Sequence, residues 1–285
     1  MALSIQSISD TPDADALGAI ATGVDLSGTI DAATATALRQ AFDEHSILCI
    51  RGQHLEPEQL LGVANLFGTA KRQINEQQQF PQVPQIGGLS SDTIDLHGTR
   101  KRVIDGTTWH TDHSFTAQPP AATLLYSLEI PDRGGNTSFC NMRAAYAALP
   151  VATKTRIDSL RALHTYESSR SARKMRTRSE QAKAQTPDVI HPLVRTHPST
   201  GAKALYMSTT RLERIVDLEA KDSYTLIDEL LAHATQEQFR CDHVWQVGDV
   251  LIWDNRCTMQ RANADYPLDA RRRMHRILIE GEVPV

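Results

Sequence analysis

Hydrophobic positions recur with a helical period near the start of the chain and then run together in a short apolar segment. Leu38 and Phe42 are four residues apart within residues 32–45, so both lie on one face of a predicted helix, with Asp31 as its N-cap. The segment SILCIR at 46–51 follows directly and predicts a buried strand that ends at Gly52.

The same kind of pattern predicts further helices and strands. Helices are expected from Pro57 to about Leu66, from Pro150 to about Leu163 and around Leu226 to Leu231, and strands at 122–129, through Phe139, at 203–208, at 250–253 and at 273–280. Many short strands, with helices near the N-terminus and in insertions, predict an α+β fold with a mainly β core, a β-sandwich or jelly roll decorated by helices. No internal repeat or linker is evident, so residues 1–285 are expected to form a single domain.

Two polar segments interrupt this pattern, at residues 71–104 and 168–186. The first is rich in Gln and turn residues and precedes the most informative motif of the chain, so it is either a lid over a site or a surface excursion. The second is a charged run that is either solvated or attracts an anionic substrate towards a cleft. Its basic residues are Arg170, Arg173, Lys174, Arg176 and Arg178.

Composition narrows the class of protein. The 285 residues are 40% hydrophobic, enough for one large core, and the net charge of −4 creates no general attraction to nucleic acid or an anionic membrane. The four cysteines form no CxxC pair, so neither a zinc ribbon nor a disulfide framework is predicted. The N-terminus does not resemble a signal peptide, and no apolar run reaches membrane length. We therefore expect a cytoplasmic protein.

The stretch Trp109-His110-Thr111-Asp112 carries the strongest chemical signal. On an extended segment, His110 and Asp112 point to the same side of the backbone, so together they can supply two ligands of a two-histidine, one-carboxylate iron site. Trp109 and Phe115 would exclude water from such a site. An isolated HxD also occurs by chance, and a histidine is more often a surface or hydrogen-bonded residue than a ligand. His113 is not expected to be a ligand.

Two stretches near the C-terminus add polar residues to a predicted sheet. In residues 248–261, a Gly-Asp turn leads into a buried strand, and polar side chains follow it. On the strand that follows, Arg272 and Arg276 share a side, with His275 opposite, so the two guanidinium groups could each hold a carboxylate. Taken alone, this basic cluster is better explained as an exposed, salt-bridged strand.

Four segments together resemble a known family. They are WHTDHSF at 109–115, GGNTSFCNMRAAYAALP at 134–150, RTHPSTGAKALY at 195–206 and WDNRCTM at 253–259. Their sequence and order, over roughly residues 15–283, resemble the taurine dioxygenase family of Fe(II)- and 2-oxoglutarate-dependent oxygenases. The segment HATQEQF at 233–239, with the second and fourth segments, is most similar to the branch that cleaves 2,4-dichlorophenoxyacetate and related aryloxyalkanoates.

This resemblance implies a double-stranded β-helix with iron near its mouth. His110 and Asp112 match the first two iron ligands, Thr137 and Arg272 match the residues that bind the carboxylate of 2-oxoglutarate, and Arg276 matches an arginine facing the acidic head of the primary substrate. The implied reaction is hydroxylation of a small anionic substrate, an aryloxyalkanoate, sulfonate or similar, next to a heteroatom. It consumes O₂ and 2-oxoglutarate and yields succinate and CO₂. Homo-oligomers are common among the relatives.

Gln260 departs from the family pattern, which has the distal iron-ligand histidine at this position. His275 is no substitute, because other members carry that histidine as well. Gln260 is a deliberate replacement, a natural loss, or a weak ligand through its amide oxygen, and an amide oxygen binds Fe(II) less well than imidazole. The chain is therefore expected to be an impaired dioxygenase. The alternatives are an inactive protein that binds 2-oxoglutarate or an organic acid, and, less well supported, a zinc hydrolase.

Overall fold

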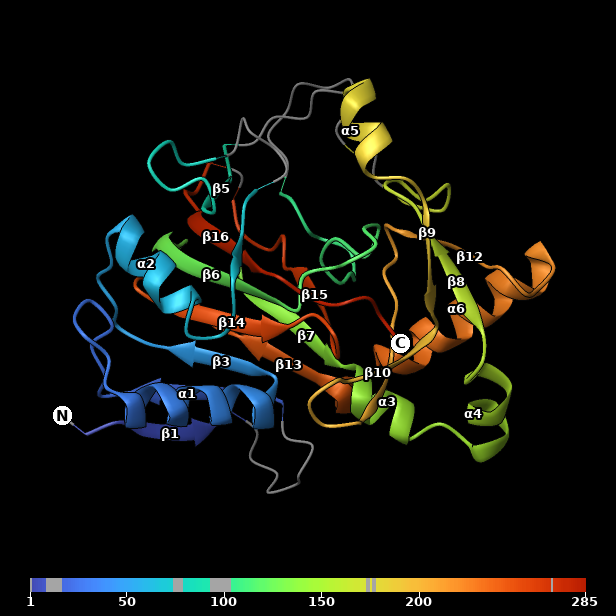
Figure 1. Cartoon of the computed structure of the whole chain (residues 1–285), viewed down its shortest axis with the longest axis horizontal. Helices are drawn as coiled ribbons and strands as arrows, with labels where there is room; N and C mark the ends of the chain where they lie inside the picture. The colour runs from blue at the N-terminus through green and yellow to red at the C-terminus, as the bar shows by residue number, and fades with distance from the viewer. Residues whose placement is uncertain are drawn as a thin grey trace.

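The computed structural model describes residues 2–8, 17–73, 79–92, 104–172, 175, 178–267 and 269–285 (Figure 1). Its main sheet, within these residues, has eight strands, all antiparallel to their neighbours except β2 and β3, which are parallel. In spatial order these strands are β1 (Ser4–Ser7), β2 (Ala19–Thr22), β3 (Ile47–Ile50), β14 (Val250–Asp254), β6 (Ala122–Glu129), β16 (Arg273–Ile279) and β4 (Ala70–Lys71), with β5 (Gly87–Ser90) also on β16.

Three smaller antiparallel sheets accompany the main sheet in the described residues. They are β13 (Arg240–His243), β7 (Thr137–Asn141) and β15 (Thr258–Ala262); β12 (Leu212–Ile215), β8 (Arg161–His164) and β9 (Val189–Pro192); and β10 (Val194–Thr196) with β11 (Lys203–Leu205). The helices are α1 (Ala32–His45), α2 (Pro57–Ala64), α3 (Met142–Ala147), α4 (Val151–Ile157), α5 (Glu180–Gln185), α6 (Ala220–Ala234) and the short 3₁₀ helix η2 (Glu237–Phe239).

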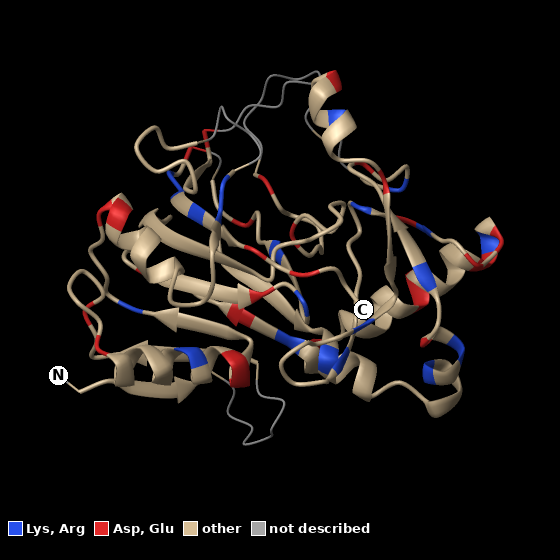
Figure 2. Cartoon of the chain, viewed as in Figure 1, with Lys and Arg blue, Asp and Glu red and all other residues tan. Residues whose placement is uncertain are grey.

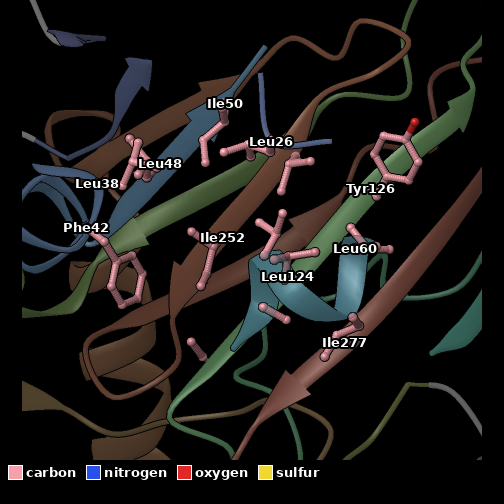
Figure 3. Close-up of a cluster of buried hydrophobic side chains, with 14 of the residues drawn as sticks. Leu26, Leu38, Phe42, Leu48, Ile50, Leu60, Leu124, Tyr126, Ile252 and Ile277 are labelled. Atoms are coloured by element: carbon pink, nitrogen blue, oxygen red, sulfur yellow. The ribbon is translucent and has the colours of Figure 1, made fainter. Parts of the chain in front are cut away.

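One face of the main sheet packs against α1 and α2 (Figure 3). Alternate side chains of β3, Leu48 and Ile50, meet Leu38 and Phe42 of α1 in this core, as the strand period of two requires. Helix α1 begins where the sequence predicts, because the Asp31 side chain accepts a hydrogen bond from the Thr34 backbone amide at 2.9 Å. This layer forms one of the hydrophobic cores of the molecule.

The opposite face of the main sheet packs against the β13–β7–β15 sheet. The other side chains of β3, Ile47 and Cys49, enter this second core, where the rings of Phe139 on β7 and Trp253 on β14 meet edge to face at 5.5 Å. Because both faces of the main sheet are covered, β3 is apolar along its whole length, as SILCIR predicts. Polar groups between these two sheets therefore lie in a largely apolar layer.

A third core lies beyond the small sheet, among α3, α6 and the strands β8, β10, β11 and β12. Here one sequence prediction is wrong, since the helix expected from Pro150 to about Leu163 ends at Ile157 and is followed by β8. Strand pairing explains the difference: residues 161–164 are hydrogen-bonded on both sides, to β9 and to β12, which the local pattern of Ile157 and Leu160 does not reveal. The expected strand at 203–208 is also shorter, ending at Leu205.

The architecture combines helices with several antiparallel sheets, and this agrees with the predicted α+β class. Lysine and arginine positions are mixed with acidic ones along α1, α5 and α6 (Figure 2).

The two polar segments are described only in part. Segment 71–104 contributes β5 and segment 168–186 contributes α5, but residues 74–78, 93–103, 173, 174, 176 and 177 lie outside the described part, so the lid predictions stay untested. None of the described helices is long and apolar enough to cross a membrane.

Candidate active site

His110 lies directly opposite Gln260 of β15. The two residues exchange backbone hydrogen bonds, from the His110 amide to the Gln260 carbonyl at 3.0 Å and back at 2.8 Å. The His110 ring nitrogen Nδ1 lies 2.7 Å from the Thr108 carbonyl and donates to it, because a carbonyl can only accept. That bond fixes the tautomer and leaves the Nε2 lone pair free, 3.6 Å from Oδ1 of Asp112.

Asp112 is oriented by a chain of buried hydrogen bonds. Its Oδ2 accepts from the Thr123 hydroxyl of β6 at 2.6 Å, and that hydroxyl accepts from the Asn255 amide at 2.9 Å. The Trp253 indole in turn donates to Asn255 Oδ1 at 3.1 Å. Burial acts to raise the pKa of Asp112, but the neighbouring His110 ring and the charge of Arg276 outweigh burial and hold that pKa below its usual range. The carboxylate is therefore ionised, with Oδ1 turned towards His110.

Gln260 completes this group from the small sheet. It pairs with Phe139, whose side chain fills the core between the two sheets, so the Gln260 side chain is directed to the same layer. The residue is 3% exposed, and neither atom of its amide has a hydrogen-bond partner among the described residues. A buried polar group without a partner costs about 1–3 kcal/mol, so such an atom calls for a bound partner, either a water or a ligand.

The His110 and Asp112 side chains lie close enough to share a divalent cation. Bonds from nitrogen or oxygen ligands to such ions are about 2.0–2.2 Å long, so two ligand atoms of one ion lie at most about 4.4 Å apart. The distance of 3.6 Å between His110 Nε2 and Asp112 Oδ1 satisfies this limit. The unpaired oxygen of Gln260 adds a third, neutral donor, which is weaker for Fe(II) than imidazole.

Thr137 lies at the start of β7, on the same face as Phe139 and two residues from it. A turn of two glycines in the left-handed region, Gly134 and Gly135 (φ +72° and +71°), leads the chain into this strand. The Trp245 indole donates to the Thr137 hydroxyl oxygen at 3.0 Å. Because the indole occupies a lone pair of that oxygen, the hydroxyl proton of Thr137 remains available for an anionic ligand.

Arg272 and Thr137 both contact the indole of Trp245. Its guanidinium is over the Trp245 ring at 5.9 Å, and its Nε donates to the Gly135 carbonyl at 3.3 Å. Burial lowers the pKa of Arg272, which remains a cation. Thr137 and Arg272 thus form a pair of donors suited to a carboxylate.

Arg276 on β16 pairs with Leu125, whose side chain lies in the core between the two sheets, so Arg276 is directed to the same layer, and its charge acts on Asp112. One amino group of its guanidinium donates to the Gln73 side chain at 3.1 Å, and its buried Nε has no partner among the described residues. The neighbouring Arg273 pairs with Glu129 at 2.9 Å. The salt-bridged reading of the basic cluster therefore holds for Arg273, and Arg276 differs from it.

Two further polar clusters lie in the cores. Cys49, His243 and Asp249 are grouped, as are His197, Asp254 and Cys257. In each the histidine Nε2 is already within hydrogen-bond distance of the aspartate, at 3.1 Å and 2.9 Å. Burial raises the pKa of the Cys257 thiol to about 12, and the pKa of Cys49 even further, so neither is a thiolate. We regard both clusters as structural.

The structure places His110 beside Asp112 and opposite Gln260, and it places Thr137 and Arg272 against the same indole, that of Trp245. Sequence reasoning missed the residues that orient them, Thr123, Asn255, Trp245 and Gln73. Asn255 was visible within the WDN motif, but the other three reach the site through strand pairing or a loop and carry no local signal.

Residues 8–278 match the model of the family described as taurine catabolism dioxygenase TauD, TfdA family. The chain belongs to this family, whose members are Fe(II)- and 2-oxoglutarate-dependent dioxygenases.

Three relatives illustrate the match. The chain is 33% identical over 264 residues to the alpha-ketoglutarate-dependent 2,4-dichlorophenoxyacetate dioxygenase of Cupriavidus pinatubonensis, covering 89% of this chain and 91% of that protein. It is 33% identical over 282 residues to the alpha-ketoglutarate-dependent sulfate ester dioxygenase of Pseudomonas putida, covering 96% and 90%. The crystal structure of AAD-2 in complex with Mn(II) and N-oxalylglycine superimposes with a TM-score of 0.81, at 28% identity, over 100% of this chain and 99% of that chain.

Proposed function

We propose that this chain is a dioxygenase of a small anionic substrate, with a metal site weakened at Gln260. His110, Asp112 and Gln260 would hold Fe(II), and Thr137 and Arg272 would hold the distal carboxylate of 2-oxoglutarate. The observation that carries this assignment is the buried, unpartnered amide of Gln260 opposite His110, on the strand pair that also bears Thr137.

Each residue has a defined task in this scheme. The carbonyl of Thr108 keeps His110 in the tautomer that offers Nε2, and Thr123 turns Oδ1 of Asp112 to the same point. When bound, Fe(II) and 2-oxoglutarate supply the oxidising chemistry that uses O₂ and releases succinate and CO₂. The protein contributes position, charge and exclusion of water, since the ligands lie in an apolar layer between two sheets.

Arg276 would face the acidic group of the substrate. Its charge is directed towards Asp112, and its partner Gln73 is neutral, so part of its hydrogen-bonding capacity is left for an anion. The named relatives act on 2,4-dichlorophenoxyacetate and on sulfate esters. A carboxylate, sulfonate or sulfate next to an oxidisable carbon is accordingly the substrate class we propose, with hydroxylation next to a heteroatom. The segments 71–104 and 168–186 would cover the site.

Three further properties belong to this proposal. The two facing sheets would be the two sides of a double-stranded β-helix, and residues 1–285 would form one oxygenase domain. We also propose that the protein is cytoplasmic and forms homo-oligomers, in line with its composition and with its relatives.

A turnover experiment tests the function. Wild type, Gln260→His and the control Gln238→His, which adds a histidine at an exposed position, are assayed for succinate with Fe(II), 2-oxoglutarate and a panel of aryloxyalkanoates, sulfonates and alkyl sulfates. We expect iron- and 2-oxoglutarate-dependent succinate from Gln260→His, and at least about tenfold less from the other two.

The outcomes separate the candidate functions. If Gln260→His turns over no acid while the wild type binds 2-oxoglutarate in calorimetry, the chain is a binding protein on the same scaffold. If neither protein binds 2-oxoglutarate with or without Fe(II), the site assignment is wrong.

A further inference from the structure

Arg211 reaches the candidate active site from a part of the chain that sequence reasoning did not connect with it. It immediately precedes β12, and its backbone carbonyl accepts from the Thr165 amide at 2.8 Å. Two residues earlier, Thr209 binds the carbonyl of Trp109 through its amide at 3.0 Å and its hydroxyl at 2.7 Å. Because Trp109 precedes His110, these bonds fix the Arg211 segment to the strand that carries the first candidate ligand.

The Arg211 side chain is enclosed by aromatic rings. Its guanidinium lies 4.7 Å from the centre of the Phe115 ring and 5.0 Å from that of Tyr166, and the two rings meet edge to face at 5.2 Å. It also donates to the backbone carbonyl of Tyr166. Burial lowers the pKa of Arg211 to about 10, so the group is desolvated but still charged at neutral pH.

The charge of Arg211 acts on the same place as that of Arg276. The His113 ring lies 5.4 Å from the Phe115 ring, which the Arg211 guanidinium also contacts, so Arg211 lies near the residue that follows Asp112. Asp112 interacts with Arg276 and with Arg211, and it is also the candidate metal ligand. His113 itself adopts the left-handed region at φ +48°, which is unusual for a non-glycine residue.

The surroundings of Arg211 do not neutralise it. Lys71 adds a further positive charge near His113, and Arg178, over the Tyr166 ring, adds another near Arg211. Of the carboxylates that act on Arg211, Asp112 belongs to the metal site, and the exposed Glu167 accepts a hydrogen bond from the Met175 amide at 2.6 Å. No ion pair joins Arg211 to a carboxylate in the described residues.

Two other arginines of this chain are paired with carboxylates. Arg195 is 1% exposed and pairs with Glu282, and Arg256 forms three hydrogen bonds to the Asp254 carboxylate. Arg211 has neutral partners instead, as Arg276 has. A desolvated cation without a carboxylate partner, beside a ligand-binding site, is arranged to receive an anion.

We propose that Arg211 is a second anion-binding residue of the substrate site, so that the preferred substrate carries two separate acidic groups. Arg276, held at Gln73 on the β5–β16 side, would bind one group, and Arg211, held at Tyr166 beyond His113, would bind the other. This deepens the function proposed above and rests on it. The substrate class narrows to dianions such as an aryloxyacetate or alkyl sulfate that also carries a carboxylate.

Calorimetry with two matched probes tests this. Phenoxyacetate carries one charge and 4-carboxyphenoxyacetate carries two, and each is titrated without O₂ into protein loaded with Fe(II) and 2-oxoglutarate. The proteins are wild type, Arg211→Met, Arg211→Lys, Arg276→Met and the control Arg161→Met, which changes an arginine paired with Asp217 outside the site. Thermal unfolding of each variant is measured alongside.

We expect the wild type and Arg161→Met to bind the dianion roughly 10- to 100-fold more tightly than the monoanion. Arg211→Met should lose this preference while keeping its affinity for the monoanion, Arg211→Lys should retain most of the preference, and Arg276→Met should weaken both probes. A merely structural arginine would lower the unfolding temperature and affect both probes equally, and that result overturns the inference. If Arg211→Met does not fold, Arg211→Gln takes its place with the same expected loss of the preference, and wild type showing no preference overturns the inference.

Failure of the underlying function has a different signature. Wild type that binds neither probe in the presence of Fe(II) and 2-oxoglutarate overturns both the acidic substrate class and the role of Arg211. Wild type that binds both probes equally overturns the role of Arg211 alone.

Discussion

Replacing Gln260 with leucine should make the metal-free protein more stable and its metal-bound form relatively less so. The Gln260 amide has two buried atoms without a hydrogen-bond partner in the described residues, and the residue is 3% exposed. Leucine has a similar size and no polar atoms to desolvate. The substitution therefore removes an unfavourable interaction in the metal-free state and a ligand in the metal-bound state.

The two effects have comparable magnitudes. One unpaired buried polar group costs about 1–3 kcal/mol, and at about 2.1 cal/mol/K per residue the unfolding entropy of 285 residues is about 0.6 kcal/mol/K. Metal-free Gln260→Leu should therefore melt about 2–5 °C above wild type. A metal ion at one hundred times its dissociation constant stabilises wild type by about 2.7 kcal/mol, or about 4–5 °C, and a tenfold loss of affinity halves that gain.

Differential scanning calorimetry over a Mn(II) titration measures both effects. Wild type, Gln260→Leu and Gln260→His are compared after treatment with a chelator and at increasing metal concentrations. Without metal, we expect Gln260→Leu to unfold at a higher temperature than wild type. The rise of the unfolding temperature with Mn(II) should be largest for Gln260→His. An identical metal response for leucine and glutamine would show that Gln260 is not a ligand, and a lower metal-free stability of Gln260→Leu would show that its amide is satisfied.

Three other substitutions give independent tests. Thr123→Val removes the hydroxyl that orients Asp112, and metal affinity measured by titration should fall about 10- to 100-fold, with unchanged affinity counting against the orienting role. Trp245→Phe removes the donor to Thr137, so KM for 2-oxoglutarate should rise about 2- to 10-fold with little change in kcat; an effect on kcat alone would contradict this reading. Asp254 is buried, and although burial raises its pKa, His197 and Arg256 hold that pKa below 3.8, so its ion pairs stabilise the protein above about pH 4 and the effect is lost on further acidification. Urea unfolding of Asp254→Asn should show a loss of about 3–5 kcal/mol at pH 7 that shrinks below pH 4, and a constant difference over this range would refute the linkage.

Local patterns in the sequence were sufficient where a few adjacent residues determine the structure. The Asp31 cap, the apolar segment 46–51 and the approach of His110 to Asp112 depend on neighbours within three or four positions. The family motif identified Gln260 as the departure from the usual ligand set. Its placement opposite His110 follows from a β-bridge between two segments that are distant in the sequence.

Long-range pairing accounts for what sequence reasoning missed. Residues 161–164 form a strand because segments near 190 and 213 flank them on both sides. The Trp245 indole meets the Thr137 hydroxyl across 108 positions of the chain, and Arg211 comes near Asp112 only because Thr209 binds Trp109. No periodicity within a window of ten or twenty residues records such contacts.

The backbone bonds between His110 and Gln260 have a consequence for the history of this protein. They involve main-chain atoms alone, so the ladder stays in register whichever side chain stands at position 260. Histidine and glutamine codons differ only in their third base, so a single mutation exchanges the two residues without disturbing the scaffold. A lineage with this architecture can therefore lose the metal ligand at position 260 by one base change and regain it by the reverse change, while the backbone bonds to His110 persist.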